Sequence, residues 1–166
     1  MTSNQKGAIA ELAIAKEAAR LKVGVYLPVF EGGRCDLVLD AGTRLLRVQC
    51  KWGALVDQII RVHFRTSRFS PTKGYVLTTY DATEVDAFGV YCGDLDECFL
   101  LPIHEFAGRN AVHLRVGPAL NGQKQGLIWA KDYRFSGAIA QLGERRAGSA
   151  KAAGSSPASS TQLRLD

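Results

Sequence analysis

The sequence lacks the features that mark zinc-binding, exported and membrane-spanning proteins. Its cysteines form no close C-x-x-C pair of the kind that holds zinc; they are Cys35, Cys50, Cys92 and Cys98. No apolar run approaches the roughly 18 residues that a membrane span needs. Charged residues interrupt the first twenty positions, which is not the pattern of a signal peptide. We therefore expect reduced thiols, a cytoplasmic location and no membrane partner.

Acidic residues are missing from one basic stretch. The chain has a formal net charge of +5, which suits a polyanionic partner without proving one. Residues 61–73, RVHFRTSRFSPTK, include no Asp or Glu and interleave basic side chains with hydroxyls and aromatics. This mixture is typical of phosphate contacts, and a solvated basic loop is the alternative. The candidate DNA-binding residues are Arg61, Arg65, Ser67, Arg68 and Lys73.

The first segment of the chain reads as a helix. A polar residue at positions 2–4 can cap it, and the Ala-rich sequence continues to about residue 21, before Gly24 ends it. At about 100° per residue, Glu11 falls in the centre of a face of small and apolar side chains. A carboxylate on such a face is costly unless a lysine or a metal ion meets it. The alternative is that Glu11 extends to the edge of this face and stays solvated.

Most of the remaining ordered sequence reads as strands. Two runs of alternating residues flank Ala41-Gly42, which predicts a hairpin. The expected strands are residues 23–29, 35–40, 43–53, 57–67, 87–92, 97–103 and 111–116. One helix followed by a series of strands predicts an α+β fold.

The composition changes after Phe135. Residues 136–166 are rich in Gly, Ala and Ser and poor in bulky apolar side chains, so we expect a disordered or loosely docked tail behind a domain of residues 1–135. A short amphipathic helix near AIAQLGERR is the alternative. Back-translated, IAQLGER and AGSSPA resemble the D-arm and the T-arm of a tRNA gene. The tail therefore resembles a translated tRNA gene that adjoins the reading frame.

Polar residues interrupt the predicted hairpin. Alternation along the second strand puts Gln49 and Lys51 on one face. With a two-residue turn, Asp36 falls opposite Arg47 on that same face, and a bulged turn shifts the pairing by a residue or two. Asp36, Gln49 and Lys51 therefore converge, and Glu11 reaches them if the helix packs on that face. Carboxylate and amide oxygens suit a hard divalent cation.

These residues also carry a family resemblance. An Asp on one strand, a polar residue and a Lys two apart on the next, and a preceding helix with a Glu resemble the PD-(D/E)XK nuclease superfamily. YLPVFEGGRCDLVLD, RLLRVQCKWG, VDAFGVYC and IWAKDYRF are similar to segments of the small PD-(D/E)XK endonucleases associated with group I introns. The resemblance covers about residues 6–135. It implies a restriction-endonuclease-like core with a mixed or antiparallel sheet.

The resemblance implies a role for each polar residue. The implied ligands of Mg²⁺ or Mn²⁺ are Asp36, Gln49, the backbone carbonyl of Cys50 and the helical acid Glu11, and Lys51 acts in the chemistry. The sequence departs from the family pattern twice. No Pro precedes Asp36, and Gln49 stands where the motif has Glu or Asp, which keeps an oxygen ligand but loses its charge.

The expected function is metal-dependent, site-specific hydrolysis of double-stranded DNA, as in homing endonucleases. Two alternatives stay open: a nuclease selective for DNA structure, such as a Holliday-junction resolvase, and a catalytically inactive DNA-binding module. One active site cuts one strand, so a double-strand break requires a homodimer or a higher homo-oligomer.

Overall fold

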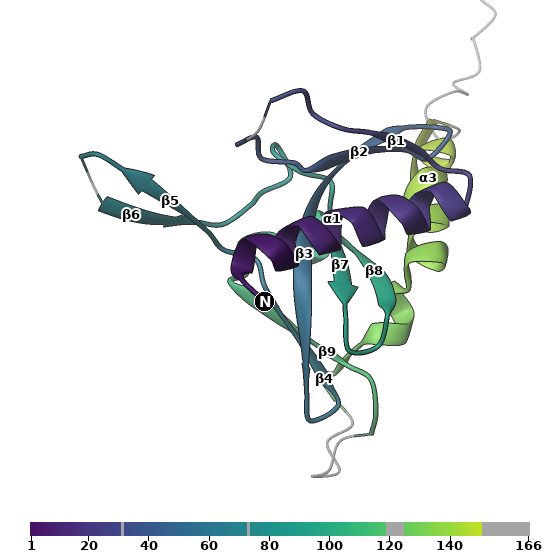
Figure 1. Ribbon diagram of the computed structural model, residues 1–166. Helices are drawn as coiled ribbons and strands as arrows, with labels where there is room; N and C mark the ends of the chain where they lie inside the picture. Colours follow the sequence, from purple (N-terminus) through teal and green to yellow (C-terminus); the bar gives the residue numbers. More distant parts are fainter. Residues whose placement is uncertain (31, 73, 119–124, 151–166) are drawn as a thin grey trace, which may run out of the picture.

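The computed structural model describes residues 1–30, 32–72, 74–118 and 125–150. It has the predicted α+β fold, with an N-terminal helix lying across one face of a mixed sheet (Figure 1). Within these ranges no helix is long and apolar enough to cross a membrane. The elements in chain order are α1 (Ser3–Arg20), β1 (Gly24–Tyr26), β2 (Leu37–Asp40), β3 (Leu45–Val56), β4 (Ile59–His63), β5 (Thr66–Ser70), β6 (Gly74–Thr78), β7 (Ala87–Cys92), β8 (Glu97–Pro102), α2 (Ile103–Phe106), β9 (Ala111–Arg115), β10 (Ile128–Trp129), the 3₁₀ helix η1 (Ala130–Tyr133) and α3 (Phe135–Ala150).

Strand β3 is the centre of the sheet. Its first part pairs antiparallel with β2, and its last part pairs antiparallel with β4 on the same side. The other side is taken by β7, which runs parallel to β3 from Val48 to Gly53. Among the described residues, positions 49–52 of β3 therefore have a strand neighbour on one side only. The resulting gap between β2 and β4 leaves backbone groups of β3 in need of other partners.

Helix α1 is capped by its own first residues and packs on the sheet through a row of small or aliphatic side chains. Thr2 and Gln5 form a capping box, in which each side chain accepts from the other backbone amide. The buried residues recur every four positions: Ala10, Ile14 and Ala18. Gly89 on β7 leaves room for this face, because a Cβ there would lie 3.2 Å from Ile14. The helix therefore lies close against β3 and β7.

The two faces of the sheet belong to two hydrophobic cores. The face under α1 includes Val48 and Cys50 of β3. The opposite face includes Phe88 of β7, within a cluster of aromatic side chains. Because side chains alternate along a strand, Gln49 and Lys51 point toward this second face, away from α1.

A predicted single strand proves to be two. Residues 57–67 are divided between β4 and β5, and the break lies at Phe64, whose side chain is fully buried. Strand β5 then pairs with β6, which the sequence analysis missed, in a two-stranded sheet of its own. This hairpin projects from the body of the molecule (Figure 1). The described part of the basic stretch therefore lies on β4, on β5 and on the link between them.

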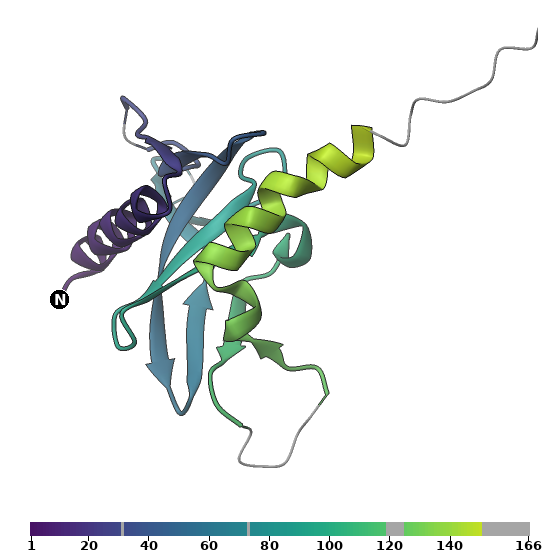
Figure 2. The ribbon, with the colours of Figure 1, turned by 90° about the vertical axis from the view of Figure 1, so that its right-hand side faces the viewer.

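The expected disorder after Phe135 is wrong for residues 136–150. They belong to helix α3, which lies along the β8 edge of the sheet (Figure 2). Helix α3 packs on the sheet with few apolar residues, because its apolar side chains fall at i, i+3, i+4 and i+7 on one face. The buried ones are Phe135, Ala138, Ile139 and Leu142. The alternative of a helix near AIAQLGERR agrees with the structure, and the rest of the predicted tail lies outside the described residues.

Candidate active site

Asp36 lies directly before β2 and beside Gln49. The two-residue turn predicted at Ala41-Gly42 is wrong, because Asp40 pairs with Leu45 and four residues form the connection. This shifts the register by two positions, which keeps every side chain on its predicted face. The shift brings Asp36 alongside Gln49, so the predicted convergence is closer than a tight turn would have allowed.

The Asp36 carboxylate points into the gap between β2 and β4. Its Oδ2 accepts from Cys50 N at 2.7 Å and from Gln49 Nε2 at 2.5 Å. The amide and the carbonyl of one strand residue face the same side, so the Cys50 carbonyl also faces the gap. Gln49 Oε1 is buried and has no hydrogen-bond partner among the described residues. Such an orphan acceptor costs about 1–3 kcal/mol, and a ligand in the gap would remove that cost.

Lys51 and Asp36 are both displaced toward their neutral forms. Burial lowers the pKa of Lys51, and the charge of Asp36 only partly opposes this. Burial raises the pKa of Asp36, and the hydrogen bond from Cys50, the charge of Lys51 and the hydrogen bond from Gln49 only partly oppose that. Desolvation therefore outweighs pairing in both groups. The carboxylate is short of positive charge, which a bound cation would supply.

Glu11 approaches the gap from the other face of the sheet. Helix α1 packs on the side that carries Cys50, opposite to Gln49 and Lys51, so the condition set for convergence is not met. The Glu11 side chain is half-buried. The pKa of the Cys50 thiol is raised well above its usual value, chiefly by burial and then by the charges of Asp36 and Glu11. The charge of Glu11 therefore reaches the Cys50 side chain on the α1 side of β3.

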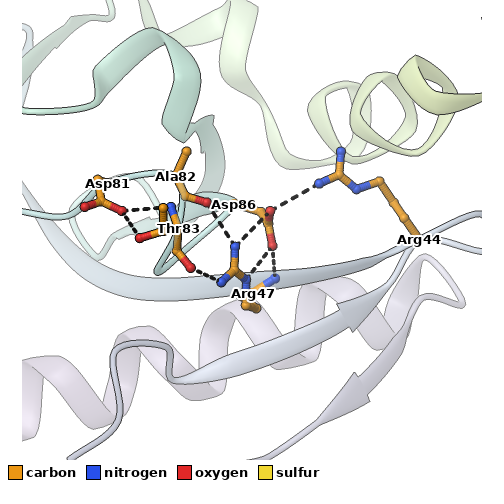
Figure 3. A network of polar contacts seen from close by, with 6 residues as sticks. All are labelled: Arg44, Arg47, Asp81, Ala82, Thr83 and Asp86. Carbon is orange, nitrogen blue, oxygen red and sulfur yellow. Dashed lines mark hydrogen bonds and ion pairs between the residues drawn. The ribbon is translucent and has the colours of Figure 1, made fainter. Parts of the chain in front are cut away.

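A second carboxylate, Asp86, is fully paired. It accepts from Arg47 N at 2.9 Å, from Arg47 Nε at 3.0 Å and from Arg44 Nη2 at 3.2 Å (Figure 3). Arg47 also donates to the carbonyls of Ala82 and Thr83. Burial by itself raises the pKa of Asp86, but the hydrogen bonds and charges of the two arginines bring it below its usual value.

Two residues that lie near Lys51 escaped the sequence analysis. Lys51 Nζ lies 5.0 Å from the centre of the Tyr80 ring, and the Tyr80 side chain is almost fully buried. Arg34 Cζ lies 3.9 Å from the centre of the same ring. These three residues come from separate parts of the chain, and no spacing rule connects them. The sequence offered one indication, since Arg34 stands two residues before Asp36 and so lies near the predicted site.

Comparison with known proteins decides the family. Residues 1–136 match the profile of the PD-(D/E)XK endonucleases. The chain belongs to the PD-(D/E)XK endonuclease family. Among solved structures it is similar to a bacterial homing endonuclease, I-Ssp6803I, with a TM-score of 0.70 and 23% identity over 89% of this chain and 99% of that chain. This similarity confirms the predicted fold. A search of curated proteins gave no match.

PD-(D/E)XK nucleases act on DNA and generally use divalent metal ions, and the residues at the gap fit such an ion. Asp36 offers a carboxylate, Gln49 an amide oxygen without a donor, and Cys50 a backbone carbonyl. Oxygen ligands of this kind suit Mg²⁺. Within the described ranges no three His, Cys, Asp or Glu side chains form a group that could hold a metal ion.

The described members of the predicted DNA-binding set of this PD-(D/E)XK endonuclease lie on β4, on β5 and on the link between them. Arg61 is exposed on β4. Arg65 is exposed between β4 and β5, and its Nε donates to a side-chain oxygen in the loop before β9 at 2.6 Å. Ser67 and Arg68 belong to β5, and Lys73 lies outside the described residues. DNA contact by these residues stays a prediction.

Proposed function

We propose that this PD-(D/E)XK endonuclease is a metal-dependent, site-specific nuclease that cuts double-stranded DNA, of the homing type. The observation that carries the proposal is the buried, unpartnered Oε1 of Gln49 beside the Asp36 carboxylate. A buried acceptor without a donor beside a partly buried carboxylate costs stability, so a site that had lost its function would not be expected to retain both. The description of the structural neighbour as a homing endonuclease supports the choice of a specific DNA site over a branched DNA structure.

Each polar residue of the gap has a role in this proposal. Asp36, Gln49 and the Cys50 carbonyl hold Mg²⁺ or Mn²⁺, and Glu11 adds negative charge from the α1 side. When bound, the cation polarises a phosphoryl oxygen and lowers the pKa of a water molecule. Lys51 presents its N–H donors to the charge that develops on the phosphate, or orients the attacking water. The partly desolvated setting of Lys51 strengthens either interaction.

DNA binding is assigned to the basic residues of β4, of the link between β4 and β5, and of β5. Arg61 and Arg65 are accessible to a phosphate backbone, and contacts of this kind supply affinity without sequence preference. One active site cuts one strand, so the proposal includes a homodimer or a higher homo-oligomer that cuts both strands.

The test is nicking of supercoiled plasmid DNA that contains the uninterrupted tRNA locus beside this reading frame. We expect cleavage with Mg²⁺, none in excess EDTA, and none by Lys51→Ala, which should still bind the DNA. A labelled duplex of the same sequence should be cut faster than a four-way junction. Preference for the junction would favour a resolvase, and an intact plasmid under all metal conditions would leave only a DNA-binding module.

A further inference from the structure

Tyr80 is fixed in place from several sides. It belongs to the segment of residues 79–86 that links β6 to β7, and it is 4% exposed. Its ring meets Phe88 edge-on, with ring centres 5.5 Å apart, and Phe88 stacks on Phe64 at 4.0 Å. The Tyr80 hydroxyl is hydrogen-bonded to Thr66. The ring therefore has one orientation, set by an aromatic cluster on the face of the sheet that carries Lys51.

Two cations lie against this one ring. Lys51 Nζ is 5.0 Å from its centre and Arg34 Cζ is 3.9 Å from it. Both distances are within the range, about 6 Å, in which a cation is attracted to the face of an aromatic ring. Two like charges at one ring repel each other, so the arrangement needs a counter-charge. Glu84 provides it, accepting from Arg34 Nε at 2.8 Å and from Nη2 at 2.7 Å.

Arginines hold both ends of the segment that carries Tyr80. Arg34 also donates to the carbonyl of Thr79 at 2.6 Å, so it binds the segment at its start and at Glu84. Arg47 binds the later part through backbone carbonyls and Asp86 (Figure 3). A connection held in this way presents its one buried ring in a fixed position.

We propose that Tyr80 is the positioning residue of Lys51, held in place by Arg34 and Glu84; the inference rests on the proposed nuclease function. An aromatic face stabilises an ammonium group without engaging its N–H donors as a carboxylate does. The donors of Lys51 therefore stay available for the phosphate, while the ring restricts where the ammonium lies. A residue that only filled the core would not need an aromatic face at this point.

The test compares Tyr80→Phe, which keeps the ring, with Tyr80→Leu, which removes it. In single-turnover cleavage at saturating DNA, Tyr80→Leu should be about tenfold slower, and Tyr80→Phe should keep most of the wild-type rate. KM should be unchanged in both. Glu84→Gln, at a partly exposed position, should slow cleavage about threefold by loosening Arg34. Equal rates for Tyr80→Leu and the wild type, a loss in KM alone, or a Phe variant as slow as the Leu variant would overturn the inference.

A second readout does not depend on cleavage. The ring should shift the NMR signals of the Lys51 side-chain methylenes upfield, and the shift should persist in Tyr80→Phe and disappear in Tyr80→Leu. If Tyr80→Leu does not fold, the wild type against Tyr80→Phe and Glu84→Gln still tests the contact. Ring-shifted Lys51 signals in a protein that cuts no DNA would reject the proposed function and leave the contact standing. Unshifted signals in an active enzyme would reject the inference alone.

Discussion

Asp36 and Asp86 are two carboxylates that flank the same strand, β3, in opposite surroundings. Asp86 accepts from two arginines and a backbone amide, and its pKa is lowered. Asp36 accepts from a backbone amide and a side-chain amide, and its pKa is raised by burial. Beside Asp36 an acceptor of Gln49 is left without a donor. Asp86 is hydrogen-bonded to charged arginines, whereas Asp36 accepts from two neutral amides.

If the proposed function is right, this difference separates the part of the sheet that stabilises the fold from the part that cuts DNA. A paired carboxylate adds to stability, and an underpaired one subtracts from it unless a ligand completes its surroundings. The two sites therefore respond oppositely to substitution. The predictions below use this contrast, from the largest expected effect to the smallest.

The matched pair Asp36→Asn and Asp86→Asn should divide activity from stability. Asp36→Asn removes the charged metal ligand, so the cleavage rate should fall by about a thousandfold or more, a loss of roughly 4 kcal/mol in barrier lowering, with stability unchanged or raised. Asp86→Asn should lose about 1.5–3 kcal/mol of unfolding free energy, because its hydrogen bonds are charge-assisted. Its rate should fall no more than about tenfold, through loosening of the Tyr80 segment. Plasmid nicking and thermal unfolding of both variants check this, and an active Asp36→Asn would contradict it.

Truncation after Arg134 tests how much of the stability lies at the β8 edge. It removes the buried stripe of α3, so the loss should be about 3 kcal/mol or more. For a chain of this size the thermal midpoint should fall by roughly 6–12 °C. Truncation after Ala150 keeps every buried side chain of that stripe and is the matched control. An unchanged midpoint in the shorter protein would show that α3 contributes nothing to the fold.

Gln49→Glu should make the stability of the protein depend on a bound divalent cation. The variant loses the Nε2 donor to Asp36 and puts two carboxylates side by side, which should cost about 1–2 kcal/mol without metal. Addition of Mg²⁺ should restore the midpoint and raise it more than in the wild type. Thermal unfolding in EDTA and in Mg²⁺ measures this. Identical responses of wild type and variant would mean that no cation binds at the gap.

The two carboxylates should also respond to pH with opposite signs. The folded pKa of Asp86 lies below its unfolded value of about 3.9, so its stabilisation is present above that value and is lost as pH falls through the folded pKa. The folded pKa of Asp36 is raised, so its cost applies above that pKa and is relieved as pH falls toward the unfolded value. The stability advantage of Asp36→Asn should therefore vanish at a higher pH than the deficit of Asp86→Asn. Urea unfolding between pH 7 and pH 3 measures both.

The sequence was sufficient where short-range periodicity decides the outcome. Alternation placed Gln49 and Lys51 on one face, and an error of two in the turn left Asp36 on that face, since the period is two. It failed where long-range packing decides. A helical wheel gives the inward face of α1 around Glu11, but not the face of the sheet that α1 covers. The low average hydrophobicity of residues 136–150 led to a prediction of disorder, although their few apolar residues share one helical face. Tyr80 and Lys51 are far apart in the sequence, so no local pattern connects them.

The smallest effects should come from the exposed arginines, which belong to neither carboxylate site. Arg61→Ala and Arg65→Ala should each weaken DNA binding a few-fold and lower the slope of log affinity against log salt by about one. The rate at saturating DNA should not change, because a phosphate contact away from the gap supplies affinity alone. Arg20→Ala, which removes an exposed arginine paired with Glu17 on α1, is the matched control and should keep the wild-type slope. Equal slopes for all three variants would place the DNA on another surface, whereas a slower saturated rate in Arg65→Ala would bring the β4–β5 link into the active site.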